Sequence, residues 1–225
     1  LLKQKSELEG LVKISCPPVM MEHQIRPLLN QFLKDHPKVQ VELELSSRRV
    51  DVMHDDIDLA IRTNFSKNED SSIIVRDVIK TVHCLVISPE LLQGRELKHL
   101  TELTEFPSIV LGTQKNRYQW HLHHTGQQEH IEIALQPRIK SNDSAGAYYA
   151  VLDGLGIADL PYLTVQADIE AGRLIHLFPE WCSNVGTVQL VYASRKGQRL
   201  VMERLIDYLV DGIRDYAPDH DGYLV

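Results

Sequence analysis

The sequence has few cysteines, few aromatic residues and no long apolar run. Its three cysteines, Cys16, Cys84 and Cys182, lie far apart, and this odd set indicates neither a CxxC metal or redox site nor a full disulfide framework. No apolar run approaches the roughly 18 to 20 residues that a membrane-crossing helix needs. The opening residues also lack the basic head, apolar stretch and cleavage site of a signal peptide. We therefore expect reduced thiols and a cytoplasmic location.

Positive charge is also scarce. Lysine and arginine total 24 against 31 acidic residues, which gives a net charge of −7. A chain with this balance lacks the positive field that drives binding to nucleic acids or anionic membranes. These residues alone should therefore not hold DNA.

Motifs that build enzyme sites are missing as well. The sequence has no GxSxG nucleophile turn, no GxxxxGK phosphate loop, no HExxH zinc motif and no GxGxxG after its first apolar run. We therefore expect no enzymatic activity, no cofactor and no metal.

What is present is a globular composition with a clear opening pattern. Of 225 residues, 43% are hydrophobic and 24% are charged, which is enough to bury a sizeable core. Residues 11–15 form a β-like run that Cys16, Pro17 and Pro18 close, because proline cannot continue a hydrogen-bonded ladder. A strand is therefore predicted to end at this turn.

Apolar residues at helical spacing over 21–33 predict a helix that ends before Pro37. Pro27 lies inside this pattern, so the regular helix either begins close to Pro27 or is bent there. Alternation over 39–45 then predicts a half-buried strand. A strand over 58–62 follows, with room for a short helix over 47–54, and this order is the signature of an α/β unit with parallel strands.

The rest of the chain repeats this organisation. Strands are predicted over 73–78, 82–88, 108–111, 131–135, 138–140, 156–158 and 188–193, and helices over 144–153, 162–170 and 200–213. Two comparable α/β halves result, followed by an acidic tail from Pro218.

Several segments in chain order carry a family resemblance. They are LEGLVKIS with CPPVM, IRPLLNQFLKDHPKVQVELEL, DDIDLAIR, SSIIVRDV with CLVISPELL, IKSNDSAGAYYAVLDGLGIADLP, AGRLIHLFPEW and VQLVYAS. With these segments, which together cover almost everything from Leu8 to Ile213, the sequence resembles the effector-binding domain of LysR-type transcriptional regulators. The set is specific, whereas a single piece such as DGLGIA resembles a loose nucleotide loop.

The resemblance implies two Rossmann-like α/β lobes of the type II periplasmic-binding-protein kind, joined by two crossover strands, with a small effector in the cleft between them. Binding at strand ends also follows from the general rule for open α/β sheets. Lobe I would comprise 11–81 and 188–213, and lobe II would comprise 82–187. Residues 1–10 would be the end of a linker helix, and 214–225 a C-terminal tail. The family's winged helix-turn-helix DNA reader is absent from this sequence.

Candidate effector contacts in lobe I lie at the predicted strand ends. The turn of Cys16, Pro17, Pro18 and Val19 leads into the first helix, whose positive end suits a carboxylate. The resemblance implies that this turn helps to hold the effector. The further candidates are Ser46, Ser47, Arg62, Thr63 and Asn64. Each has a structural alternative: a small buried cysteine, turn or cap residues, and an arginine in an ion pair.

Candidates in lobe II lie at the start of the helix predicted over 144–153. We expect Asp143 to cap this helix, because its own carboxylate would occupy the positive end. Asn142 and Ser144 are then candidate ligand contacts. Pro161 would form part of the apolar wall, or equally belong to the core.

A histidine cluster is the one group with metal-like chemistry. His121, His123 and His124 lie in a polar region that offers no acidic or thiol ligand before Glu129. Because a structural zinc site needs four ligands, we predict a solvated loop rather than a metal site or a pH sensor.

These observations predict the ligand-sensing and oligomerisation domain of a LysR-type bacterial regulator, for whose effector a carboxylate is one candidate. The resemblance implies antiparallel homodimers, tetramers of the full-length protein, and DNA contact only through the absent winged helix-turn-helix. No membrane partner is expected. The alternative is a solute-binding protein of a transport system with the same fold. The opening LLKQKSELEG, which has the pattern of a helix arriving from upstream, argues against that alternative.

Overall fold

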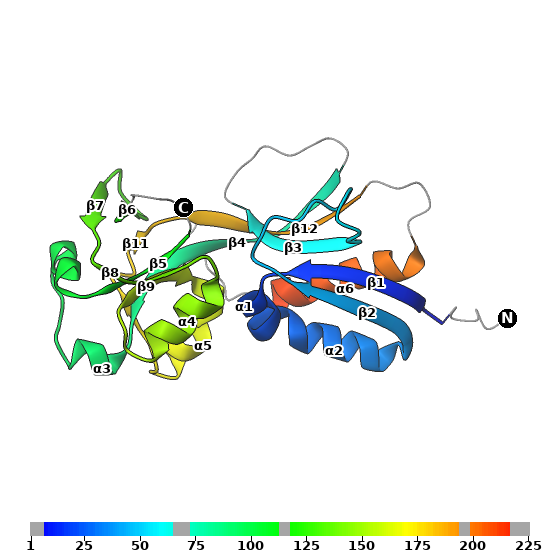
Figure 1. The fold of residues 1–225 in the computed structure, drawn as a ribbon, viewed down its shortest axis with the longest axis horizontal. Coiled ribbons are helices and arrows are strands. Elements are labelled where there is room, and N and C mark those ends of the chain that lie inside the picture. Colours follow the sequence, from blue (N-terminus) through cyan, green and yellow to red (C-terminus); the bar gives the residue numbers. More distant parts are fainter. Residues whose placement is uncertain (1–6, 65–72, 113–117, 194–198, 217–225) are drawn as a thin grey trace. The chain divides into compact units, whose positions relative to one another are not determined.

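The computed structural model describes residues 7–64, 73–112, 118–193 and 199–216. These residues form two compact units (Figure 1). Unit 1 contains the described residues up to Ile79 and from Thr187 onward, and unit 2 contains those of Lys80–Gly186. Strands β4 (Ile73–Ile87) and β12 (Val185–Ala193) include residues of both units and carry the chain from one to the other. The predicted α/β fold with two crossover strands is confirmed.

Unit 1 is built on a mixed sheet in the order β2-β1-β3-β12-β4. Its further strands are β1 (Glu9–Cys16), β2 (Lys38–Leu45) and β3 (Leu59–Asn64). β1 pairs in parallel with β2 and β3, whereas β12 runs antiparallel to β3. The carboxyl ends of β1, β2 and β3 therefore meet at one edge of the sheet.

The helical segment after β1 shows how the chain accommodates Pro27. It runs through α1 (Pro18–Met20), a π-helical stretch η1 (Met21–Ile25) and α2 (Arg26–Asp35). The Arg26 N–H bonds to the Met21 carbonyl, five residues back. Because proline has no N–H to donate, a widened turn just before Pro27 lets the helical path continue. The expectation that regular helix begins close to Pro27 is therefore confirmed, since α2 starts at Arg26, and a π-helical stretch precedes it.

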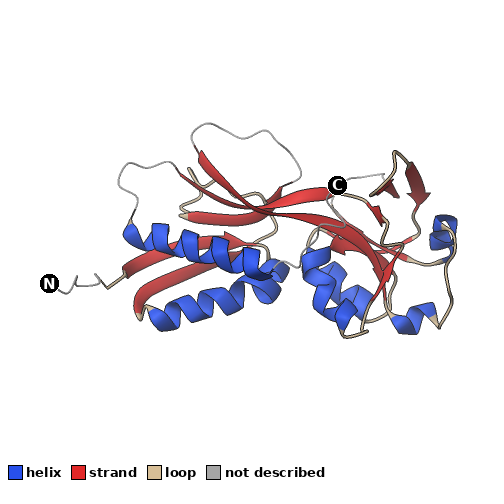
Figure 2. Cartoon of the chain, turned by 180° about the vertical axis from the view of Figure 1, so that it is seen from behind, coloured by secondary structure: helices blue, strands red, loops and turns tan. Residues whose placement is uncertain are grey.

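Helix α6 (Leu200–Tyr216) closes unit 1 by packing against α2 and β1 (Figure 2). The rings of Phe32 and Tyr208 lie 5.3 Å apart. A Cβ added at Gly212 would stand 2.5 Å from a methyl carbon of Leu28, so the two helices approach closely at this glycine.

In unit 2 the sheet order is β4-β9-β5-β8, with β10 also pairing with β4. Its strands are β5 (Ser108–Leu111), β8 (Pro137–Ser141), β9 (Ile157–Pro161) and β10 (Ile175–Leu177). Its helices are α3 (Pro89–Leu92), the 3-10 helix η2 (Leu100–Glu105), α4 (Ser144–Leu152) and α5 (Tyr162–Glu170). In both ribbon views α4 and α5 lie on one side of this sheet (Figures 1 and 2).

A small three-stranded sheet lies on the other side of unit 2, in the order β11-β6-β7. Its strands are β6 (Gln119–His124), β7 (His130–Ala134) and β11 (Trp181–Cys182). Trp120 and Leu122 of β6 are buried in a core that also contains Leu85 and Ile157 of the larger sheet. The prediction of a solvated loop at the histidines is therefore wrong, because alternate residues of this segment bury an apolar face.

Two other local expectations are also wrong. Residues 47–54 form turns instead of a short helix. The Asp51 carbonyl accepts the N–H groups of His54 and Asp55 at 3.1 and 2.8 Å, and the Asp51 side chain accepts that of Met53 at 2.9 Å. These bonds close a single turn, to which the Asp51 side chain adds a local bond. The strands predicted over 73–78 and 82–88 form the single strand β4, which Thr81 continues as a buried residue.

The glycines of the DGLGIA segment have structural roles. Gly154 adopts a φ of +70° just after α4, a conformation that other residues adopt only with strain. A Cβ at Gly156 would stand 2.7 Å from the Pro107 carbonyl oxygen, and that carbonyl accepts the Ile157 N–H at 2.9 Å. The segment therefore connects α4 to β9 and packs its backbone closely against Pro107, just before β5.

The chain ends fall partly outside this description. Of the linker helix predicted for 1–10, residues 1–6 lie outside the described residues, so that part stays a prediction. The helix does not include Glu9 and Gly10, which begin strand β1. Of the tail predicted for 214–225, residues 214–216 belong to α6 and the rest lies outside the described residues. Among the described residues, no helix is both long and apolar enough to cross a membrane.

Candidate functional site

The strand ends of unit 1 bring together most of the candidates predicted there. Cys16 pairs with Leu45 across β1 and β2, and the Ser46 N–H donates to the Cys16 carbonyl at 3.1 Å. Thr63 and Asn64 end β3, which also lies next to β1. We call this edge the strand-end surface of unit 1, and it comprises Cys16, Pro17, Pro18, Val19, Ser46, Ser47, Thr63 and Asn64.

The Cys16 side chain does not reach the outside of unit 1. It is fully buried, and burial raises the pKa of its thiol. A buried, protonated thiol is a poor nucleophile and a poor anion receptor. The structure thus favours the interpretation of Cys16 as a small core residue, and a contact with ligand through its backbone stays a prediction.

The polar members of the strand-end surface are more accessible than Cys16. Ser46, Thr63 and Asn64 are half-buried, and Ser47 is exposed. The Ser46 hydroxyl accepts the Arg48 N–H at 3.2 Å, which is the turn role anticipated for it. No side chain caps the helical segment at Pro17, so its positive end has no acidic side chain bonded to it.

Arg62 lies apart from these hydroxyl groups. Successive residues of a strand point to opposite faces, and Arg62 lines a cavity of about 330 Å³ with the turn residues Arg49, Asp51 and His54. Hydrogen bonding to Asp51 raises the pKa of His54. The structure therefore separates Arg62 from Thr63, although they are neighbours in sequence.

The three candidates of unit 2 also lie at strand ends. β8 and β9 are both parallel to β5, so Asn142 and Ser144, which follow β8, lie at the same edge as Pro161, which ends β9. Asp143 stands at the cap position of α4, but its side chain makes no cap hydrogen bond. Instead the Ser141 hydroxyl accepts the Asp143 N–H at 3.1 Å and donates to its carbonyl at 2.7 Å. The cap prediction is right in position and wrong in chemistry.

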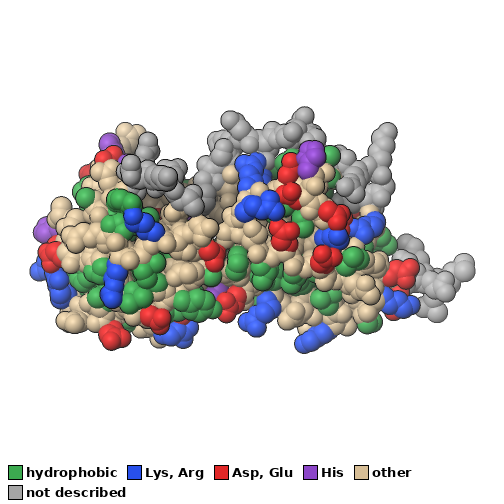
Figure 3. Space-filling model, viewed as in Figure 1, with side chains coloured by type: hydrophobic (Ala, Val, Ile, Leu, Met, Phe, Trp, Pro, Cys, Tyr) green, Lys and Arg blue, Asp and Glu red, His purple; other side chains and the backbone are tan. Residues whose placement is uncertain are grey.

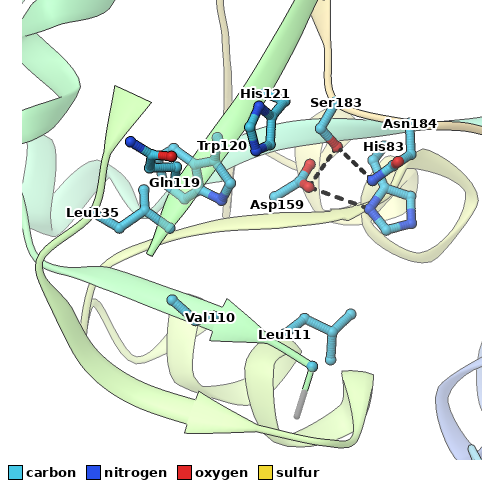
Figure 4. Close-up of a pocket in the computed structure, with 11 residues that line it drawn as sticks. His83, Val110, Leu111, Gln119, Trp120, His121, Leu135, Asp159, Ser183 and Asn184 are labelled. Atoms are coloured by element: carbon cyan, nitrogen blue, oxygen red, sulfur yellow. Dashed lines mark hydrogen bonds and ion pairs between the residues drawn. The ribbon is translucent and has the colours of Figure 1, made fainter. Parts of the chain in front are cut away.

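A cavity inside unit 2 was not foreseen from the sequence (Figure 4). It has a volume of about 400 Å³ and is lined by His83, Val110, Leu111, Gly112, Gln119, Trp120, His121, Leu135, Asp159, Ser183 and Asn184. Figure 4 shows His83, Asp159, Ser183 and Asn184 grouped on one side, with Trp120 and Leu135 on the other. We call this space the unit 2 cavity.

Hydrogen bonds organise the polar side of the unit 2 cavity. The Ser183 hydroxyl donates to Oδ2 of Asp159 at 2.5 Å and accepts from the Asn184 amide at 3.2 Å. Nδ1 of His83 lies 3.4 Å from the same Oδ2. The one available sequence signal was Asp159 itself, an acidic residue between apolar strand residues in IADLP.

The histidine cluster does not form a metal centre among the described residues, where no group of three potential ligands comes together. His121 and His123 lie on the exposed side of β6, and Nδ1 of His121 lies 3.2 Å from a Glu132 carboxylate oxygen.

On the face drawn in Figure 3, basic and acidic side chains of the coloured residues are interspersed rather than gathered into a basic patch.

Comparison with known proteins gives consistent matches. A family model described as the LysR substrate binding domain matches residues 5–214. The chain is 27% identical over 192 residues to an HTH-type transcriptional regulator of Haemophilus influenzae, and this match covers 85% of this chain and 65% of that protein. It is 25% identical over 216 residues to the HTH-type transcriptional regulator PtxR of Pseudomonas aeruginosa, and this match covers 91% of this chain and 65% of that protein. The chain thus spans somewhat less than two thirds of the length of these regulators.

A solved structure shares the fold. The regulatory domain of CrgA, a LysR-type transcriptional regulator from Neisseria meningitidis, matches with a TM-score of 0.78 at 22% identity, covering 92% of this chain and all of that chain.

Proposed function

The chain belongs to the LysR substrate binding domain family, and we propose that it senses a small effector for a transcriptional regulator. The observation that carries this proposal is the family match over residues 5–214, nearly the whole chain. DNA contact is assigned to a winged helix-turn-helix outside these residues, because the matched relatives are HTH-type regulators of which the chain spans 65%. A regulator that acts on bacterial DNA works in the cytoplasm, so the cytoplasmic location belongs to this proposal.

We place effector contacts at the strand-end surface of unit 1. Hydroxyl and amide groups of Ser47, Thr63 and Asn64 offer donors there, beside the uncapped start of the helical segment at Pro17. Pro17 and Pro18 have no N–H to donate, but the Val19 N–H belongs to the first helical turn. Backbone N–H groups at a helix start favour anions, so we propose a carboxylate as the effector class. Asn142, Ser144 and Pro161 of unit 2 are proposed as further contacts, and the predicted cleft between the lobes stays a prediction.

The effector would act by shifting a conformational equilibrium. A ligand can do this only through its difference in affinity for two states. The proposal therefore requires two arrangements of the full-length regulator that differ in effector affinity and in DNA affinity. Homodimers, and tetramers of the full-length protein, are part of this proposal, and sedimentation showing a strict monomer at high concentration would count against them.

The test is a thermal-shift screen of carboxylates and aromatic acids on this chain, followed by calorimetry on two variants. We expect one or more acids to bind, and Ser47→Ala and Thr63→Val each to weaken binding by about threefold to tenfold, the worth of one hydrogen bond. Thr101→Val, a hydroxyl loss in unit 2, should leave the affinity unchanged. Unchanged affinity in both unit 1 variants would overturn the site assignment.

The alternative of a transport solute-binding protein has no support in the reported comparisons, which are with transcriptional regulators and a regulatory domain. The names of these relatives are also those of regulators rather than enzymes. We therefore propose no bond-making step for this chain.

A further inference from the structure

We infer that the unit 2 cavity is a second ligand site, which takes a small molecule that presents a hydrogen-bond donor, an ammonium or a hydroxyl group, to the Asp159 carboxylate. All of its lining residues belong to unit 2. None of them is a member of the strand-end surface of unit 1 or one of the unit 2 candidates Asn142, Ser144 and Pro161. The inference therefore does not depend on the proposed function.

The first argument is the unused acceptor capacity of Asp159. Its side chain is 13% exposed. Oδ2 accepts the Ser183 hydroxyl, whereas Oδ1 is buried and has no hydrogen-bond partner among the described residues. A carboxylate can accept about four hydrogen bonds, so Asp159 has capacity for a further donor. Because Oδ1 is buried, a ligand in the cavity would donate to Oδ2, beside the Ser183 hydroxyl.

The second argument is the charge of the lining. Among the described lining residues, Asp159 is the only carboxylate, and none is a lysine or an arginine. The Asp159 carboxylate would repel an anionic ligand, and no described lining residue offers a fixed positive charge to offset that repulsion. A neutral donor or a cation meets no such repulsion.

The third argument is shape. Trp120 and Leu135 lie opposite the Asp159 side, and Val110 and Leu111 form a further apolar wall (Figure 4). A cavity of about 400 Å³ with apolar walls and a few converging polar groups has the make-up of a small-molecule site. The expected ligand thus has a compact apolar body with a donor at one end.

The test uses three probes with one ring and different head groups: benzylamine, benzyl alcohol and benzoate. The chain has two tryptophans, of which Trp120 lines the cavity and Trp181 does not. Their indole N–H signals in a proton–nitrogen spectrum, assigned with a Trp181→Phe variant, give a cavity reporter and an internal control. Titration to about 10 mM is sufficient, because probes of this size bind in the millimolar range.

We expect benzylamine or benzyl alcohol to shift the Trp120 signal and not the Trp181 signal, and benzoate to bind at least about tenfold more weakly. Tighter binding of benzylamine would show that the site recognises positive charge. Tighter binding of benzyl alcohol would show that it recognises a hydrogen-bond donor alone. Asp159→Asn should weaken benzylamine by about tenfold or more. Asp153→Asn, the same charge change at an exposed position of unit 2, should not.

Three results would overturn the inference: no probe moves the Trp120 signal, benzoate binds as well as benzylamine, or Asp159→Asn binds benzylamine like the parent chain. If Asp159→Asn fails to fold, the three probes on the unchanged chain decide alone.

Discussion

The strand-end surface of unit 1 and the unit 2 cavity gather polar groups in different ways. In unit 1, hydroxyl and amide groups follow the ends of β2 and β3 and remain half-buried or exposed. In unit 2, a carboxylate, two histidines and a serine are collected from β4, β6, β9 and the residues after β11 around a partly open cavity. The first arrangement is local to strand ends, whereas the second requires two sheets to pack on each other. The difference shows that two α/β units can gather polar side chains either at neighbouring strand ends or between packed sheets.

The largest expected effect concerns the backbone contact of unit 2 that supports the cavity. Gly156→Ala places a Cβ against the Pro107 carbonyl, just before the strand that carries Val110 and Leu111 to the cavity. We expect the free energy of unfolding, measured by urea titration, to fall by about 1 to 3 kcal/mol. Gly126→Ala is the control, because its nearest neighbour would lie 3.8 Å away, and it should change stability by less than about 0.5 kcal/mol. Equal effects at both glycines would contradict the close backbone contact.

The next effect compares thiols of the two units. Cys16, below the strand-end surface, is 0% exposed, whereas Cys182, adjacent to Ser183 of the cavity, is 8% exposed. Burial raises the pKa of both thiols. Because reactivity follows access and thiolate content, we expect a maleimide to label Cys182 at least about tenfold faster than Cys16 in the native chain, as followed by peptide mass spectrometry.

Labelling in denaturant provides the control for that comparison, since both thiols should then react alike. If Cys16 reacts first in the native chain, the strand-end surface of unit 1 is more open than described.

The smallest effect concerns one histidine from each unit. Hydrogen bonding to Asp51 raises the pKa of His54 in unit 1, whereas burial lowers the pKa of His176 in unit 2. His54 therefore contributes stability below its ordinary pKa of about 6.5, and loses it as pH rises through its raised value. His176 acts oppositely: the unfolded chain takes up its proton more readily, so stability falls as pH drops below about 6.5.

Imidazole titration by NMR checks both directions. His54 should titrate above 6.5 and His176 below it. Asp51→Asn should return His54 toward its ordinary value and leave His176 unchanged. Two histidines that shift in the same direction would contradict the contrast.

Much of the fold could be predicted from local pattern. Alternation marked β2, helical spacing marked α6, and α5 was predicted with the bounds that the structure has. β6 was missed because its exposed histidines made a strand with buried Trp120 and Leu122 look polar throughout. β4 was divided because its first part alternates in burial and its second part is buried throughout.

The site was predictable only where neighbouring strand ends decide it. Cys16 and Ser46 meet because β1 and β2 pair in parallel, as the strand–helix–strand order implied. Arg62 was grouped with Thr63 although the strand directs their side chains to opposite faces. Asp159, Ser183 and His83 are far apart in the sequence, and no local pattern links them.

The amino-acid sequence alone determined the α/β class, most helices and strands, and the family resemblance, because periodicity and turn residues act over a few neighbouring positions. Tertiary structure alone decided that His83, Asp159 and Ser183 share a cavity, since their contact depends on the register of β4 against β9 and on the packing of β6 over the larger sheet. Register and packing are properties of segments brought together from distant parts of the chain.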